Sequence, residues 1–124
     1  MTDIRKEGTS KTPTVVATLQ PFSLELSGRS IPENSIAFYQ PLMDWVEVHC
    51  GNGENQLEIN IRLEYFNTSS SKCLMDLLKR VEAKGCPARV NWYYEEDDED
   101  MLEAGEDYDA IIDLPFRLIA STTN

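Results

Sequence analysis

The clearest pattern in the sequence is a strict alternation of apolar and polar residues in QLEINIRLEYF, residues 56–66. Every second position from Leu57 to Tyr65 is apolar, and the polar positions between them are Glu58, Asn60, Arg62 and Glu64. This period is typical of a strand with one buried face, because a strand covered on both faces would be apolar throughout. The segment therefore predicts a sheet that packs helices mainly on one face and leaves the opposite face more exposed to solvent.

Two other segments carry apolar residues at helical spacing. The first set consists of Phe38, Leu42, Trp45, Val46 and His49, and the second of Leu74, Leu77, Leu78 and Val81. Each set forms one face of an α-helix. Pro41 lies inside the first pattern, so we expect it either to begin the main helix after a separate turn or to kink one longer helix. Gly85 is a natural stop for the second helix.

Shorter apolar segments complete the predicted elements. Two short strands lie on either side of Gln20-Pro21, another covers Ala88–Tyr94, and a last one covers Ile111–Ser121. The order is β-β-α-β-α-β, an acidic connection, and β, which implies parallel pairing through right-handed crossovers. We predict a flexible N-terminal segment, residues 1–11, followed by a single two-layer α/β domain, residues 12–121, with a mixed, mostly parallel sheet.

Negative charge is concentrated in one segment. The chain has 11 basic and 22 acidic residues, a formal net charge of −11, and residues 95–109 alone hold ten acidic residues and no basic one. We expect an acidic connection there, with a short helix around Met101–Ala104, that is either solvated and mobile or in contact with a basic partner. Its spacing does not fit a calcium-binding EF-hand loop. The remainder lacks the Lys and Arg clusters that nucleic-acid binding requires.

Signals of export, membrane insertion and catalysis are missing from the sequence. The N-terminus has no apolar signal-peptide core, and no apolar run approaches the roughly 18 residues of a membrane span. Cys50, Cys73 and Cys86 lack paired spacing, which favours reduced thiols in the cytoplasm. His49 is the only histidine, and the common nucleotide, metalloprotease and hydrolase motifs do not occur. We expect a cytoplasmic protein that is not an enzyme and holds no metal or cofactor.

Aromatic residues provide a further candidate surface. Trp45, Trp92, Tyr93 and Tyr94 could together form a ligand shelf, but core packing is the simpler explanation for both tryptophans. Tyr93 falls on the wetter side of the predicted sheet, so it is the better candidate for an interface.

The segment NTSSS, residues 67–71, has more hydroxyls than a helix start needs. One side chain caps a helix and contributes about 0.5–2 kcal/mol, yet five consecutive residues here could do so. Either one residue caps and the others continue a polar loop, or the segment contains a phosphoacceptor. A phosphate at a helix N-terminus meets unpaired N–H groups and the positive end of the dipole, and it adds about −1.5 to −2 charge at pH 7.

Several of these residues together resemble the bacterial SiaC family of regulatory phosphoproteins. The resembling segments are YFNTSS at 65–70 with Lys72 and Met75-Asp76, PENS at 32–35, DWVE at 44–47, Trp92-Tyr93 and Pro115-Phe116. The resemblance extends from about Thr12 to Ile119. Because the fold of that family is similar to the STAS domain of anti-sigma factor antagonists, the resemblance implies a small STAS-like domain.

The resemblance also implies a switch between partners. A dedicated Ser/Thr kinase would phosphorylate Thr68, and a PP2C-type phosphatase would remove the phosphate. The unmodified protein would bind and activate a diguanylate cyclase, which raises cyclic di-GMP and favours biofilm formation. The residues that flank the acceptor and would contribute to partner binding are Asn67, Ser69, Ser70, Ser71 and Lys72.

Two other functions stay open at this point. Anti-sigma factor antagonists of the STAS type usually have an Asp-x-Ser pattern and a nearby glycine at this junction, whereas this chain has Asn67-Thr68-Ser69 and no glycine. A small ligand-binding protein or enzyme would have to rely on the aromatic residues and His49.

Overall fold

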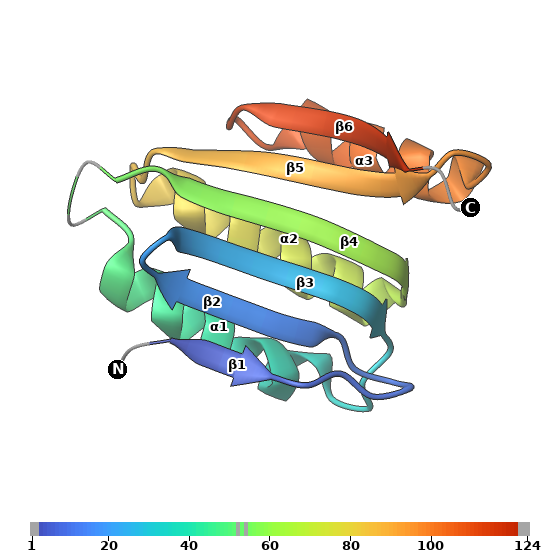
Figure 1. The fold of residues 1–124 in the computed structure, drawn as a ribbon, viewed down its shortest axis with the longest axis horizontal. Coiled ribbons are helices and arrows are strands. Elements are labelled where there is room, and N and C mark those ends of the chain that lie inside the picture. Colours follow the sequence, from blue (N-terminus) through green and yellow to red (C-terminus); the bar gives the residue numbers. More distant parts are fainter. Residues whose placement is uncertain (1–2, 52, 54, 122–124) are drawn as a thin grey trace.

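In the described part of the chain, residues 3–51, 53 and 55–121 of a computed structural model, six strands form one sheet and three helices pack on one of its faces (Figure 1). The strands are β1 (Ile4–Lys6), β2 (Thr14–Leu19), β3 (Phe22–Ser30), β4 (Leu57–Phe66), β5 (Ala88–Glu95) and β6 (Phe116–Ser121). The helices are α1 (Ser35–His49), α2 (Thr68–Ala83) and α3 (Glu99–Ile111). This confirms the predicted two-layer α/β class.

The strands follow one another across the sheet in chain order. β1, β2 and β3 pair antiparallel, whereas the pairs β3–β4, β4–β5 and β5–β6 are parallel. One helix joins each parallel pair, and a right-handed crossover repeated in the same direction places every helix on the same face. The other face is left uncovered, as predicted.

The hydrophobic core lies between the sheet and the helices. Its most completely buried side chains include Leu24, Leu26, Leu42, Trp45, Leu57, Ile59, Ile61, Leu74, Leu77, Leu78 and Trp92. The predicted apolar faces of β4 and α2 are therefore confirmed, and burial of each such side chain contributes about 1.5–3 kcal/mol.

Tyr65 is an exception, because it is 52% exposed instead of buried. The pairing of β3 with β4 shifts by one residue there: Gly28 pairs with Leu63, but Arg29 pairs with Tyr65. The extra residue reverses the alternation, so Phe66 takes the inward position and packs against the core. The prediction for Tyr65 was wrong because a bulge moves every later side chain to the other face.

α1 runs without interruption from Ser35 to His49, with Pro41 inside it. The structure therefore excludes a separate turn before the main helix. Pro41 is exposed, and so is Ala37, whose carbonyl loses its usual helical donor. Because that carbonyl lies on the solvent side, water can satisfy it.

The prediction of a flexible N-terminal segment over residues 1–11 is wrong for residues 3–11, the part that the structure describes. Ile4–Lys6 form β1, in which Ile4 pairs with Ala17, and the following turn is closed by a hydrogen bond from the N–H of Thr9 to the carbonyl of Thr12, 2.9 Å. Three residues are too few to reveal a period of two. Residues 1 and 2 lie outside the described residues.

The acidic segment contains a complete helix instead of a mobile connection. α3 begins after Asp98, whose Oδ1 accepts a hydrogen bond from the N–H of Met101 at 3.0 Å, and it continues to Ile111. Met101, Gly105 and Tyr108 face the core. The short helix predicted around Met101–Ala104 was correctly placed but too short, and the last strand begins at Phe116 instead of Ile111.

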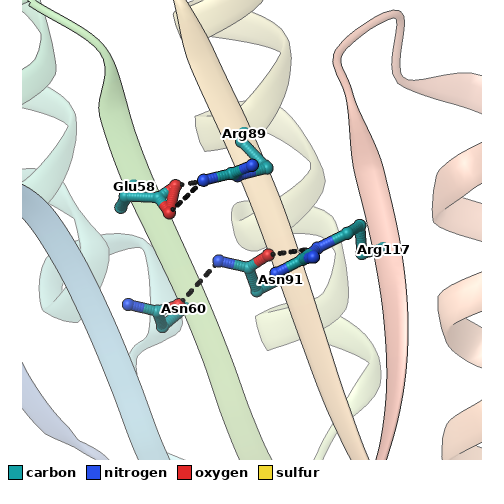
Figure 2. Close-up of polar contacts among 5 residues, drawn as sticks. All are labelled: Glu58, Asn60, Arg89, Asn91 and Arg117. Atoms are coloured by element: carbon teal, nitrogen blue, oxygen red, sulfur yellow. Dashed lines mark hydrogen bonds and ion pairs between the residues drawn. The ribbon is translucent and has the colours of Figure 1, made fainter.

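Polar side chains on the uncovered face are paired across the strands (Figure 2). Arg89 donates two hydrogen bonds to Glu58, of 2.9 and 3.1 Å. Asn91 donates to Asn60 at 2.9 Å and accepts from Arg117 at 3.2 Å. The pKa of Glu58 is lowered by these bonds from Arg89. These contacts satisfy the hydrogen-bonding groups of the Asn91 side chain, although that residue is buried.

Candidate functional site

The hydroxyl segment lies where β4 ends and α2 begins, beside the first turn of α1. Asn67 is the N-cap of α2: its Oδ1 accepts from the N–H of Ser70 and its carbonyl accepts from the N–H of Ser71, each at 2.9 Å. Asn34 caps α1 in the same way, since its Oδ1 accepts from the N–H of Ala37 at 3.1 Å. Asparagines therefore cap both helices, and the hydroxyl residues are not needed for that purpose.

A buried network of hydroxyl groups connects β3, α1 and α2. The Ser30 hydroxyl donates to the Ser70 hydroxyl at 2.9 Å and lies 2.7 Å from the Tyr39 hydroxyl. The Ser35 hydroxyl lies 2.8 Å from that of Ser69 and 3.3 Å from that of Ser70. Ser30 and Ser70 are fully buried, and each is satisfied within the network. The structure thus places Ser70 inside the protein, where it supports α2 instead of presenting a surface to a partner.

Ser71 connects α2 to α3. The Tyr108 hydroxyl donates to the carbonyl of Ser71 at 2.7 Å and lies 3.0 Å from its hydroxyl. Because Tyr108 also packs against Trp92, with ring centroids 4.9 Å apart, this contact fixes the helix of the acidic segment to the start of α2.

Thr68 is the first residue of α2 and is exposed. Its hydroxyl makes no hydrogen bond within the described residues. Ser69 is also exposed, but its hydroxyl is engaged by Ser35 and lies 3.3 Å from Oδ1 of Asn67. Lys72 is exposed one turn after Thr68, so the two lie on the same side of α2. Within the described residues, Thr68 therefore has the accessible hydroxyl of segment 67–71 that makes no hydrogen bond.

The phenols beside this segment remain protonated at neutral pH. Burial raises the pKa of Tyr39 to about 12, although its hydrogen bond with Ser30 opposes the rise. Burial likewise raises the pKa of Tyr108 to about 12. Both groups act as neutral hydrogen-bonding groups, and neither can serve as a general base at physiological pH.

The single histidine lies at the other end of α1 from the hydroxyl network. His49 is the last residue of α1, so the 15-residue helix separates it from Ser35 by roughly 20 Å. Its ring packs on Trp45, with centroids 5.4 Å apart. Within the described residues, no group of three or more His, Cys, Asp or Glu side chains is arranged to hold a metal.

The sequence matches the SiaC family of regulatory phosphoproteins over residues 6–121. This chain belongs to the SiaC family. A protein of Pseudomonas aeruginosa strain UCBPP-PA14, described only as uncharacterized, is 35% identical to it over 123 residues, which are 97% of this chain and 98% of that protein.

Solved SiaC structures have the same fold. Apo-SiaC from Pseudomonas aeruginosa superimposes with a TM-score of 0.88 at 35% identity, over 97% of this chain and 100% of that one. SiaC from the same organism, in a crystal structure of the diguanylate cyclase SiaD in complex with its activator SiaC, gives a TM-score of 0.90 at 34% identity, over 96% and 100%. Membership of the SiaC family confirms the resemblance seen in the sequence.

Several contributors to the SiaC-like site were missed by sequence reasoning. Ser30 and Tyr39 complete the hydroxyl network, and Ser35 was identified only as part of the PENS segment at 32–35. All three carry a hydroxyl group at a position that faces the core. The neighbouring sequence, however, does not indicate that their hydrogen-bond partners lie on α2. Exposed Ile36 and Tyr65, at 73% and 52%, lie next to the junction and were also missed.

The aromatic predictions are largely confirmed. Trp45 and Trp92 are fully buried, and Nε1 of Trp92 donates to the carbonyl of Met101 at 3.1 Å. Tyr93 lies on the uncovered face, where the guanidinium of Arg62 stacks 3.7 Å from its ring centroid. An interface role for Tyr93 stays a prediction. Among the described residues, no helix has the length and apolar content that crossing a membrane requires.

Proposed function

We propose that this chain is a non-catalytic cytoplasmic regulator that binds and activates a diguanylate cyclase when unmodified, and that phosphorylation of Thr68 breaks this contact. The observation that carries the proposal is the state of Thr68. Its hydroxyl is exposed and makes no hydrogen bond in the described residues, whereas the hydroxyls of Ser69, Ser70 and Ser71 are all engaged. Membership of the SiaC family and the complex of a relative with the cyclase SiaD support the choice of partner.

The position of Thr68 suits a phosphate. The first N–H groups of a helix have no partner inside the helix. In α2 the N–H of Ser70 is taken by Oδ1 of Asn67, and that of Ser71 makes the first intrahelical bond, to the Asn67 carbonyl. Within the described residues, the N–H groups of Thr68 and Ser69 remain for an anion or water. A negative charge at this end of α2 is stabilised by about 0.3–1 kcal/mol, so the modified domain stays folded.

The surface next to Thr68 supports the proposal that the modification weakens a complex. Ile36 follows Ser35, whose hydroxyl contacts Ser69, and Tyr65 lies at the end of β4 just before the Asn67 cap. Both side chains are largely exposed and apolar. In a partner interface that includes these side chains and Thr68, a phosphate with about −1.5 to −2 charge carries a large desolvation cost unless cations meet it.

Two enzymes are needed to operate the switch. A Ser/Thr kinase supplies the nucleotide and metal for phosphorylation, and a PP2C-type phosphatase reverses it. This chain serves as the substrate of both, with Asn67, Ser69, Ser71 and Lys72 around the acceptor. Ser70 acts from the interior by holding the first turn of α2 in place.

Cyclase activation by defined variants tests the proposal. We expect wild type and Thr68→Ala to activate the cognate cyclase equally, and Thr68→Glu to lose at least about tenfold in apparent affinity, as expected for a charge buried without a partner. Ser10→Glu, which adds the same charge to an exposed residue of the N-terminal loop, serves as the control and should behave as wild type.

The outcomes separate the parts of the proposal. Full activation by Thr68→Glu would contradict the switch at this residue. If the wild-type protein does not bind a cyclase but co-purifies with a regulator of a sigma factor, the cyclase assignment fails and the anti-sigma antagonist function takes its place.

A further inference from the structure

A groove with an apolar floor lies between the end of β4 and the start of α3. It has a volume of about 330 Å³ and is lined by Glu64, Tyr65, Phe66, Asp98, Asp100, Met101 and Ala104. The half-exposed ring of Tyr65 and the partly buried side chains of Phe66 and Ala104 form its apolar part. The contact of Tyr108 with Ser71 holds α3 against the start of α2.

The rim of this groove is negatively charged. Glu64, Asp98 and Asp100 line it, and Asp97 and Glu99 flank it on the turn before α3 and in its first residue. Within the described residues, no ion pair joins a carboxylate of residues 96–109 to a basic side chain; the carboxylates that form ion pairs are Glu25, Glu33, Glu47 and Glu58. These charges exceed what the N-terminus of α3 needs for its dipole. The groove therefore complements an amphipathic segment with apolar side chains and several Lys or Arg residues.

The groove ends next to the phosphoacceptor. Phe66 lines it, Asn67 follows as the N-cap, and Thr68 is the next residue. A segment that occupies the groove is thus placed within reach of the Thr68 hydroxyl.

The sign of the charge indicates which partner uses the groove. A phosphate on Thr68 makes this region more negative and would attract a basic segment more strongly, whereas the cyclase in our proposal is released by the phosphate. The groove is present in the unmodified chain, which is the substrate of the kinase and the product of a PP2C-type phosphatase. A kinase must bring the phosphates of a nucleotide to this acidic region, so it needs cationic side chains around its active site.

We propose that this groove is the docking site for a basic, amphipathic segment of the kinase that phosphorylates Thr68. The proposal rests on the function proposed above, since it requires that a kinase act on Thr68. Docking outside the acceptor stabilises the ground state and the transition state equally, so its loss raises KM and leaves kcat unchanged.

Kinase kinetics with two charge-matched variants of the full chain test the assignment. The groove variant carries Glu64→Gln, Asp97→Asn and Asp100→Asn, and leaves the capping Asp98 intact. The control carries Glu106→Gln, Asp107→Asn and Asp109→Asn, which removes three carboxylates from exposed positions of α3 outside the groove. We expect the groove variant to raise KM for the protein substrate roughly fivefold with an unchanged kcat, the size expected for a few exposed charge pairs, and the control to change KM less than about twofold.

Salt provides an independent readout. KM of the wild-type chain should rise with ionic strength, because screening weakens exposed charge pairs, and this dependence should be smaller in the groove variant than in the control. Tyr65→Ser, which removes part of the apolar floor, should raise KM in the same direction.

Each contrary result has its own meaning. An unchanged KM in the groove variant, or an equal rise in the control, would overturn the docking site while phosphorylation of Thr68 still stands. Weaker cyclase activation by the groove variant with an unchanged KM would assign the groove to the cyclase and overturn its assignment to the kinase. A chain that the kinase does not phosphorylate at all would overturn the proposed function and this inference with it.

Discussion

The Ser69 hydroxyl lies 2.8 Å from the Ser35 hydroxyl, and this contact joins the first turn of α2 to the first turn of α1. Ser35 also lies 3.3 Å from Ser70, which in turn accepts from Ser30 at the end of β3. The positive ends of two helices therefore meet beside the exposed Thr68. The crowding of hydroxyls at residues 67–71 is explained by this junction, because all but one of these residues hold elements together.

Replacing Ser35 by Ala should loosen the junction between the two helices. The change removes a buried hydroxyl and leaves Ser69 and Ser70 with one partner fewer, so we expect a loss of about 1–3 kcal/mol in the free energy of unfolding. Urea unfolding followed by circular dichroism measures this loss. Ser10→Ala, at an exposed position, should stay within about 0.5 kcal/mol of wild type. Equal stability of the two variants would contradict a structural role of the hydroxyl network.

Asn67 and Thr68 should differ sharply in their contribution to stability. Asn67→Ala removes the N-cap of α2 and should cost about 0.5–2 kcal/mol, whereas Thr68→Ala removes a hydroxyl without a described hydrogen bond and should change stability by less than about 0.5 kcal/mol. Thermal unfolding of the two variants makes the comparison. A larger loss for Thr68→Ala would show that this hydroxyl is committed to the fold.

Gly105→Ala should destabilise the protein even though Ala is the better helix former. A Cβ at this position would lie 2.6 Å from Cδ2 of Leu118 and 2.7 Å from Cδ1 of Trp92. Helix propensity favours the change by about 1 kcal/mol, but overpacking costs about 1–3 kcal/mol, so a net loss is expected. The free energy of unfolding is measured in urea for Gly105→Ala and for a control, Asp109→Ala, which changes an exposed residue of the same helix. Increased stability of Gly105→Ala would mean that α3 does not pack closely on β5.

The buried tyrosines should make the protein sensitive to alkali. Tyr39 and Tyr108 have folded pKa values raised from 10 to about 12, so the unfolded chain releases protons at a lower pH than the folded chain does. Their contribution to stability is complete below pH 10 and is lost as the pH rises to 12, about 2–3 kcal/mol for each group. Urea unfolding at intervals over this range should show a shallower decline in Tyr39→Phe than in wild type. An equally steep decline would contradict the burial of the Tyr39 hydroxyl.

The hydrophobic pattern correctly predicted those elements in which the spacing of the apolar residues shows both the type of element and its buried face. The alternation in β4 and the spacing of Leu74, Leu77, Leu78 and Val81 in α2 are of this kind, and the structure confirms both. The position of Tyr65 could not be predicted, because the bulge that exposes it depends on the pairing of Gly28 and Arg29 in another strand.

The length of α3 was hidden for a related reason. Its inward face consists of Met101, Gly105 and Tyr108, and a glycine in the middle interrupts the apolar pattern. That glycine is explained by Trp92 on β5, whose ring occupies the space of a side chain. The acidic composition alone favoured a mobile connection, and only packing against β5 shows otherwise.

The candidate acceptor was recognisable from the sequence, but its surroundings were not. The hydroxyl segment was identified from its place before a helical pattern, and Thr68 within it from the family resemblance. The distinction between Thr68 and its neighbours depends on Ser30, Ser35 and Tyr39, which are more than 25 residues away. They reach α2 through the pairing of β3 with β4 and the packing of α1 against α2. Long-range contacts therefore decide which hydroxyl of the segment is free.

Site mapping by mass spectrometry after treatment with the cognate kinase is the most decisive test of a switch at Thr68. We expect a single phosphate, carried by Thr68, and an unmodified product when Thr68→Ala is treated in the same way. A phosphate on Ser69 or Ser70 of the wild-type chain, or undiminished phosphorylation of Thr68→Ala, would contradict it.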